Sequence, residues 1–102
     1  MRLNVYSVFD VASGVYMRPF FMQSDGQAMR SFSDIAQDAE HDIGKHPEDY
    51  SLFRIGHYDD NKGSLVGEAP ECLATALEVV AAARRVSREN LEEFDAEVSD
   101  GA

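Results

Sequence analysis

The amino-acid sequence predicts an α+β domain, in which a small antiparallel sheet of two hairpins packs against two helices in the order β-β-α-β-β-α. Two observations point to this class. Short apolar runs with period-two alternation flank glycine-containing turns, which is the pattern of strands in hairpins. Two longer segments instead repeat apolar residues every three or four positions, as amphipathic helices do. The chain has 102 residues, 44% of them hydrophobic, which is enough for one core.

The first hairpin is expected at residues 2–9 and 15–22. Residues 2–9 alternate in period two and are rich in β-branched and aromatic side chains. The turn at residues 10–14 ends in a glycine that can adopt positive φ. Pro19 lacks a backbone donor, so the second strand is expected to lie at a sheet edge or to be bulged.

The first helix is expected at about residues 25–37. Ser24 and Gln27 have the spacing of a capping box, which marks a helix start. The residues that follow place apolar side chains on one helical face and polar ones on the other. The apolar face comprises Ala28, Phe32, Ile35, Ala36 and Ala39.

The second hairpin is expected after a polar turn at Pro47. Residues Tyr50–Tyr58 form its long strand, which is apolar on both faces and therefore belongs in the centre of the sheet. Gly56 interrupts this strand and predicts a bulge or a close approach of two backbones. A polar tip leads to a short fourth strand at Ser64–Val66.

A second helix is expected to begin near Pro70, because proline is tolerated in the first turn of a helix. Apolar residues then recur at intervals of four and three as far as Val98, interrupted by Arg84 and Ser87. The pattern fits one long helix, or a core-packing helix to about Arg85 followed by a separately capped segment. We expect helix throughout.

Charge is distributed unevenly along the chain. The net charge is −10; all 9 bases lie at or before Arg88, whereas six of the 19 acids follow it. We expect one domain at residues 1–93 and an acidic, weakly ordered tail at residues 94–102. An acidic chain is poorly suited to nonspecific binding of duplex DNA, which requires many cations.

Cysteine usage and hydropathy indicate the compartment. Cys72 is the only cysteine, so no intrachain disulfide can form and a reducing compartment fits. No apolar run approaches the roughly 20 residues that a membrane span needs, and the N-terminus lacks the pattern of a signal peptide. We expect a cytoplasmic protein without membrane contact.

Patterns for catalysis and metal binding are weak. Histidines and acids occur in the polar connection and at the second hairpin tip, but their spacing matches no dedicated metal motif. These residues are His41, Asp42, His46, Glu48, Asp49, His57, Asp59 and Asp60. Cys72 has no identifiable base partner, and neither a nucleophile elbow nor a glycine-rich phosphate loop is present. We therefore expect no enzymatic activity, no cofactor and no metal.

Aromatic and basic residues are interleaved on the predicted strands. Side-chain alternation allows Tyr6, Tyr16, Arg18 and Phe20 to share one face, and Tyr50, Arg54 and Tyr58 have the same parity. Exposed aromatics beside arginines can stack the bases of single-stranded DNA. The candidate nucleic-acid-binding residues are Arg2, Tyr6, Tyr16, Arg18, Arg54 and Tyr58.

The alternative is that these aromatics cover the core or a dimer interface, and the residues alone favour it. A homodimer is expected in either case. Two hairpins and two amphipathic helices in a chain of this length leave sheet edges and apolar faces to be covered.

The most specific stretch of the sequence is KHPEDYSLFRIG followed by DD and a glycine, at residues 45–63, with AMRSFSD upstream. In these motifs and their order, residues 3–80 resemble the small nonstructural protein of gokushovirus-type microviruses, which are single-stranded-DNA phages. The chain departs from that family at its end, where an alanine-rich and acidic extension continues to Ala102.

The resemblance implies a phage nonstructural protein in the host bacterial cytoplasm that acts in synthesis or handling of the viral single-stranded-DNA genome, by binding single-stranded DNA. It supplies no catalytic residues. The alternative is an adaptor that docks on a viral replication or packaging protein without touching DNA. Charge separates the two functions, because an acidic chain must concentrate its arginines on one face to bind DNA.

Overall fold

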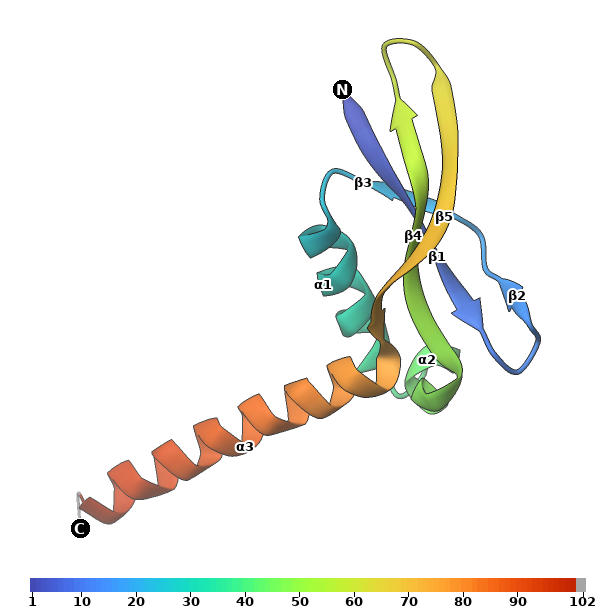
Figure 1. The fold of residues 1–102 in the computed structure, drawn as a ribbon. Helices are drawn as coiled ribbons and strands as arrows, with labels where there is room; N and C mark the ends of the chain where they lie inside the picture. The colour runs from blue at the N-terminus through green and yellow to red at the C-terminus, as the bar shows by residue number, and fades with distance from the viewer. Residues whose placement is uncertain (101–102) are drawn as a thin grey trace.

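The computed structural model describes residues 1–100, and for residues 91–100 it describes the backbone alone. Runs of strands and runs of helices follow one another along the chain (Figure 1), and every strand pair is antiparallel, which confirms the predicted α+β class. In chain order the elements are β1 (Arg2–Asp10), β2 (Val15–Tyr16), β3 (Phe20–Met22), α1 (Asp25–Ala36), α2 (Asp42–Lys45), the 3-10 helix η1 (Pro47–Asp49), β4 (Tyr50–Asp59), β5 (Ser64–Thr75) and α3 (Ala76–Asp100).

The sheet is antiparallel and has the strand order β2-β1-β4-β5, with β3 pairing β1 beside β2. Strand β1 pairs β4 along its whole length, from Arg2 opposite Asp59 to Asp10 opposite Tyr50. Strand β4 also pairs β5 on its other side. The prediction that Tyr50–Tyr58 lies in the centre of the sheet is therefore confirmed.

The first hairpin differs from the continuous second strand expected at residues 15–22. The structure has two short strands there, β2 and β3, separated by residues 17–19. Pro19 lies in this break, where its missing N–H interrupts no ladder hydrogen bond. The turn before β2 contains Gly14 with φ of 72°, the left-handed conformation that glycine accepts without strain.

The end of the second hairpin corrects two predictions. The fourth strand is not the short Ser64–Val66 but β5, which continues to Thr75, and the last helix begins at Ala76 rather than near Pro70. Pro70 falls in an irregular part of the β4–β5 ladder, on a strand at the edge of the sheet, where a missing donor is tolerated. The Thr75 side chain accepts a hydrogen bond from the Glu78 amide at 3.2 Å, as a helix N-cap does.

Helix α1 begins where its capping box predicts. The Ser24 side chain accepts a hydrogen bond from the Gln27 amide at 3.2 Å, and the helix ends at Ala36. The polar connection that follows contains the short helices α2 and η1, which the sequence patterns did not predict. The His41 ring accepts a hydrogen bond from the Ile43 amide at 3.1 Å and so caps α2.

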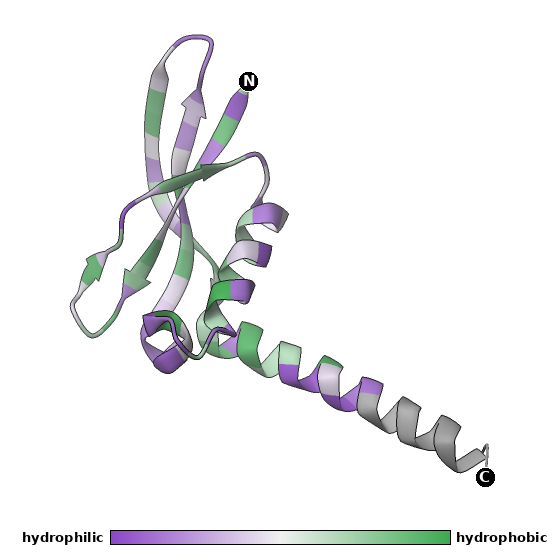
Figure 2. Ribbon diagram, turned by 180° about the vertical axis from the view of Figure 1, so that it is seen from behind, coloured by the Kyte–Doolittle hydropathy of each residue, from purple (hydrophilic) through white to green (hydrophobic). Residues whose placement is uncertain are grey.

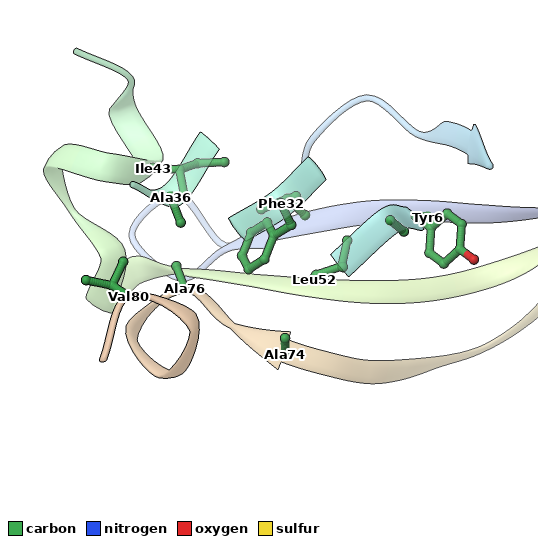
Figure 3. Close-up of a cluster of buried hydrophobic side chains, with 10 residues drawn as sticks. Tyr6, Phe32, Ala36, Ile43, Leu52, Ala74, Ala76 and Val80 are labelled. Atoms are coloured by element: carbon green, nitrogen blue, oxygen red, sulfur yellow. The ribbon is translucent and has the colours of Figure 1, made fainter. Parts of the chain in front are cut away.

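The core lies between one face of the sheet and the helices α1, α2 and α3 (Figure 3). Tyr6 and Leu52, from the two central strands, and Phe32, from α1, are almost fully buried there. The first turn of α3 adds Ala76 and Val80. Helices therefore cover one face of the sheet and leave the other without a helical layer.

Helix α3 extends away from the sheet and from α1 (Figure 1). Its turns nearest the sheet are coloured hydrophobic in Figure 2, and the next turns are coloured mainly hydrophilic. The expectation of one long helix is confirmed, with its start moved to Ala76. The backbone of residues 94–100 is part of α3, so the predicted weak order of the tail stays a prediction, and residues 101–102 lie outside the described part of the chain. Across the described residues, no helix has both the length and the apolar character needed to cross a membrane.

Candidate nucleic-acid interface

Aromatic side chains gather on the face of the sheet that the helices leave uncovered. The register shows this, because directly paired residues share a face and successive residues alternate between faces. Phe9 is paired with Tyr16, Val5 with Phe21, and Leu3 with Tyr58. Ser7, which lies between Val5 and Phe9 in the alternation, is paired with Phe53. We call this surface the aromatic face; its aromatic residues are Phe9, Tyr16, Phe21, Phe53 and Tyr58.

The rings of the aromatic face form two groups. Phe9, Tyr16 and Phe53 make a triangle with centroid separations of 4.8, 5.6 and 6.3 Å. Phe21 and Tyr58 form an edge-on pair at 5.5 Å. Tyr16 is 43% exposed and Phe21 46% exposed, so each group presents one ring to solvent. Tilted and edge-on contacts hold the rings in place and leave flat surfaces on which a further ring can stack.

The opposite face of the sheet carries a polar network where β1 and β4 meet α1. The Tyr6 hydroxyl donates a hydrogen bond to the Asp25 carboxylate at 2.8 Å. The Arg54 guanidinium pairs with Asp25 and with Glu71 of β5. Asn4 donates to the Tyr6 hydroxyl at 2.9 Å and to Asp25 at 3.3 Å. Burial, together with the neighbouring Asp25, raises the pKa of Tyr6 to about 12.

The structure separates the six residues predicted to bind nucleic acid. Tyr16 and Tyr58 lie on the aromatic face, whereas Tyr6 is fully buried and Arg54 is paired with two acids on the helix-covered face. Arg2 is exposed at the start of β1. By alternation it lies on the same side as Asn4, away from Tyr58.

Arg18 is the predicted arginine nearest in sequence to the aromatic face. It is exposed in the break between β2 and β3, two residues after Tyr16, and among the described side chains it makes no ion pair. Among the predicted residues, the structure therefore brings together Tyr6 and Arg54. Tyr16 contacts Phe9 and Phe53, and Tyr58 contacts Phe21 in the other group of rings.

A bulge in β4 explains why equal parity did not place Arg54 and Tyr58 on one face. The β1–β4 register shifts between Arg54 and Gly56, because β4 has one extra residue there relative to β1, and the alternation of β4 is reversed beyond it. The β4–β5 register is irregular at the same place, with the additional residues on β5. The predicted close approach of two backbones is also present at Gly56, because a Cβ added there would lie 2.3 Å from the carbonyl oxygen of Val66 in β5. Both alternatives offered for Gly56 are confirmed.

Sequence reasoning did not select Phe9, Phe21 and Phe53. The signal that could have found Phe9 is the hairpin itself, because a turn at residues 10–14 pairs Phe9 with Tyr16 across the two strands. The bulge in β4 prevented Phe53 from being assigned to the face of Tyr58. The break at Pro19 did the same for Phe21 and Tyr16. Both irregularities change which residues share a face.

The histidines and acids considered as metal ligands have structural partners. His41 caps α2, and His57 forms an ion pair with Glu68. His46, Glu48 and Asp49 do lie close together around η1, where the His46 ring is 3.7 Å from the Glu48 carboxylate. Their exposure fits a solvated turn of α2 and η1. Cys72 lies in β5, because the last helix begins at Ala76 and not near Pro70.

Comparison with known proteins gives one family. A family model described as "Phage ORF5 protein" matches residues 3–79. No curated protein and no solved structure matches the chain. The matched residues include all five strands, both short helical turns, α1 and the start of α3, and they leave out the part of α3 that extends beyond the sheet.

Proposed function

The chain belongs to the Phage ORF5 protein family, and on that basis we propose that it serves a phage in synthesis or handling of a single-stranded-DNA genome, by binding unpaired bases on the aromatic face. The proposal includes a microvirus of the gokushovirus type, as the Lys45–Gly63 motif suggests, and action in the host bacterial cytoplasm. It involves binding without a catalytic step.

The gathering of five aromatic side chains on one uncovered face of the sheet is the observation that carries the proposal. Tyr16 and Phe21 are each nearly half exposed, and each makes tilted or edge-on contact with other rings. Stacking of a base on such a ring contributes about 1–3 kcal/mol and tolerates any sequence, because every base has a flat face. In a duplex the base faces are stacked on one another and cannot contact these rings, so single strands are preferred.

Charge sets the character of this binding. The net charge of the chain is −10, and Arg54 is already paired with Asp25 and Glu71. Arg18 is then the arginine best placed to attract phosphate beside the aromatic face. With so few cations, affinity comes from stacking, and the logarithm of the binding constant falls only slightly with the logarithm of salt concentration, by a slope of about −1.

Fluorescence anisotropy with a labelled oligothymidine strand and a labelled duplex, each at two salt concentrations, tests the proposal. Tyr16→Ala and Phe21→Ala should each weaken single-strand binding roughly five- to hundredfold, as expected for loss of one stacked base. Met29→Ala removes a similarly exposed apolar side chain from α1 and is the matched control. The absence of measurable wild-type affinity for the single strand at low salt would refute direct DNA binding.

An adaptor function is the second candidate, and the acidity of the chain favours it. Aromatic residues are enriched at protein interfaces, where a negative net charge does not oppose binding. In this case the aromatic face docks on a viral replication or packaging protein. Tyr16→Ala and Phe21→Ala would then weaken binding to that purified protein, while the wild-type chain would leave single-stranded DNA unbound.

A further inference from the structure

A groove runs between α3 and the end of α1, on the side of the molecule where α2 and η1 lie. Its volume is about 490 Å³. Its lining consists mainly of small and apolar residues, among them Ala36, Ala39, Pro47 and Ala83, and also includes the polar Gln37 and Ser87. Arg84 and Arg88 also line it from α3, where a spacing of four residues places both guanidinium groups along the same side of the helix. The groove thus combines an apolar floor with a basic rim.

Helix α3 continues beyond this groove with a sequence of the complementary character. After Arg88 the chain has six acids and no base. Leu91, Phe94 and Val98 recur at intervals of three and four, which is the spacing of one apolar helical stripe. By the same spacing, Glu92 and Asp95 lie along one side of that stripe, the side on which Arg84 and Arg88 lie one to three turns earlier.

The end of α3 cannot occupy the groove of its own chain. The helix is continuous from Ala76 to Asp100 and contains neither glycine nor proline, so nothing in it permits a reversal of direction. Residues 89–100 therefore leave the groove behind, extending about 18 Å further at 1.5 Å per residue. Only another molecule can present this segment to the groove.

We propose that residues 89–100 of a second copy of this chain bind in the groove, so that two α3 helices pair in antiparallel orientation. A two-fold axis then relates the copies, and each groove receives the other copy's segment. Glu92 and Asp95 then meet Arg88 and Arg84, while the apolar stripe covers the small residues of the floor. This inference is independent of the proposed DNA binding.

Charge selects the antiparallel orientation. In a parallel pair the acidic segments of the two chains would lie beside each other, and Arg84 of one chain would face Arg84 of the other. The antiparallel pair instead sets the basic segment of each helix against the acidic segment of its partner. Exposed ion pairs contribute little affinity, but like charges held together are unfavourable, so the charges fix orientation while apolar contact provides most of the stability.

Charge reversal and restoration in the full-length chain test this inference, with mass measured by multi-angle light scattering and sedimentation equilibrium. The wild-type chain should have twice the monomer mass of 11.3 kDa at high micromolar concentration. Arg84→Glu with Arg88→Glu should weaken dimerisation at least tenfold. Adding Glu92→Arg and Asp95→Arg to the same chain should restore it. Arg85→Glu is the control for a single charge reversal on α3 outside the groove lining, to be compared with Arg84→Glu alone.

Three results would overturn the inference. One is a monomeric wild-type chain at high micromolar concentration. If the DNA affinity of that monomer depends on Arg84 and Arg88, the groove binds DNA and not a second copy. Another is a dimer that tolerates Arg84→Glu with Arg88→Glu, which would place the interface elsewhere, such as on the β5 edge. The third is failure of the four-residue variant to dimerise while its far-ultraviolet circular dichroism matches that of the wild type.

Discussion

The Tyr6 hydroxyl donates a 2.8 Å hydrogen bond to Asp25, and this bond joins the central strand β1 to the first residue of α1. Tyr6→Phe keeps the buried ring and removes the bond. We expect the free energy of unfolding to fall by about 1–2 kcal/mol, as for the loss of one hydrogen bond to a charged group. Urea denaturation would measure this, and an unchanged midpoint would show that the bond contributes nothing.

The same tyrosine predicts how stability depends on alkaline pH. Its pKa is about 12 in the folded chain, above the ordinary value of 10.0, so the folded state holds the proton more tightly than the unfolded state. The resulting stabilisation is complete below pH 10 and is lost as pH rises through about 12; it amounts to roughly 2–3 kcal/mol. Tyr6→Phe should reduce this alkaline loss, leaving the part due to Tyr50, whose pKa is also raised by burial. Urea midpoints measured from pH 9 to 12 would check it, with Tyr16→Phe as the control.

Gly56→Ala should destabilise the chain strongly. The added Cβ would lie 2.3 Å from the backbone oxygen of Val66, so the central β4–β5 ladder must shift to admit it. We expect a loss of about 1–3 kcal/mol, as for overpacking. Gly67→Ala on β5 is the control, because a Cβ there meets nothing within 4 Å. Equal thermal stability of the two variants would contradict the close approach.

Arg54→Ala should lower stability without changing intrinsic DNA affinity. It removes the guanidinium that pairs with Asp25 and Glu71, and so leaves Asp25, only partly exposed, without its cation. Arg18→Ala should do the reverse, weakening binding and flattening its salt dependence while melting as the wild type does. Anisotropy titrations and thermal melts on both variants separate the two roles. If Arg54→Ala is fully folded and binds DNA more weakly than the wild type, Arg54 contributes to DNA binding directly.

Deletion of residues 95–102 should leave a folded protein, because the core lies within the sheet, α1, α2 and the first turns of α3. The shortened chain should also be monomeric, since it lacks part of the segment proposed to fill the groove. Circular dichroism and light scattering would check both outcomes. An unfolded product would show that the tail is part of the core, and tighter DNA binding would show that its acids oppose DNA electrostatically.

The sequence predicted those elements whose signals are local. Ser24 and Gln27 marked the start of α1 to the residue, because a helix cap depends on neighbours three positions apart. The apolar character of Tyr50–Tyr58 likewise predicted a central strand. The helix start predicted at Pro70 was wrong because the fixed φ of proline suits both a first helical turn and an edge strand. The pairing of β5 with β4 decides between the two.

The candidate site was harder to predict because it depends on which residues share a face. The bulge at Gly56 places Tyr58 on the face opposite Arg54. The glycine indicated a bulge, but the residue at which the alternation reverses depends on the pairing with β1, which strand alternation alone does not give. The partners of Arg54 come from α1 and β5, distant in sequence, so its neutralisation could not be inferred from strand alternation. Tyr16 lies on the aromatic face, and the two rings that contact it, Phe9 and Phe53, come from β1 and β4.

The pairing of β1 with β4 has a consequence for synthesis on the ribosome. The first strand can meet β2 and β3 soon after it emerges, but its long ladder with β4 cannot close until residues near Asp59 have been made. Until then the apolar side of β1 is covered by little more than its own hairpin and the nascent α1. Closure of such a distant pairing is slow relative to local contacts, so the emerging chain passes through a stage at which its central strand has a free edge. Chaperone capture at that stage, before β4 arrives, would be expected to raise the yield of the folded protein.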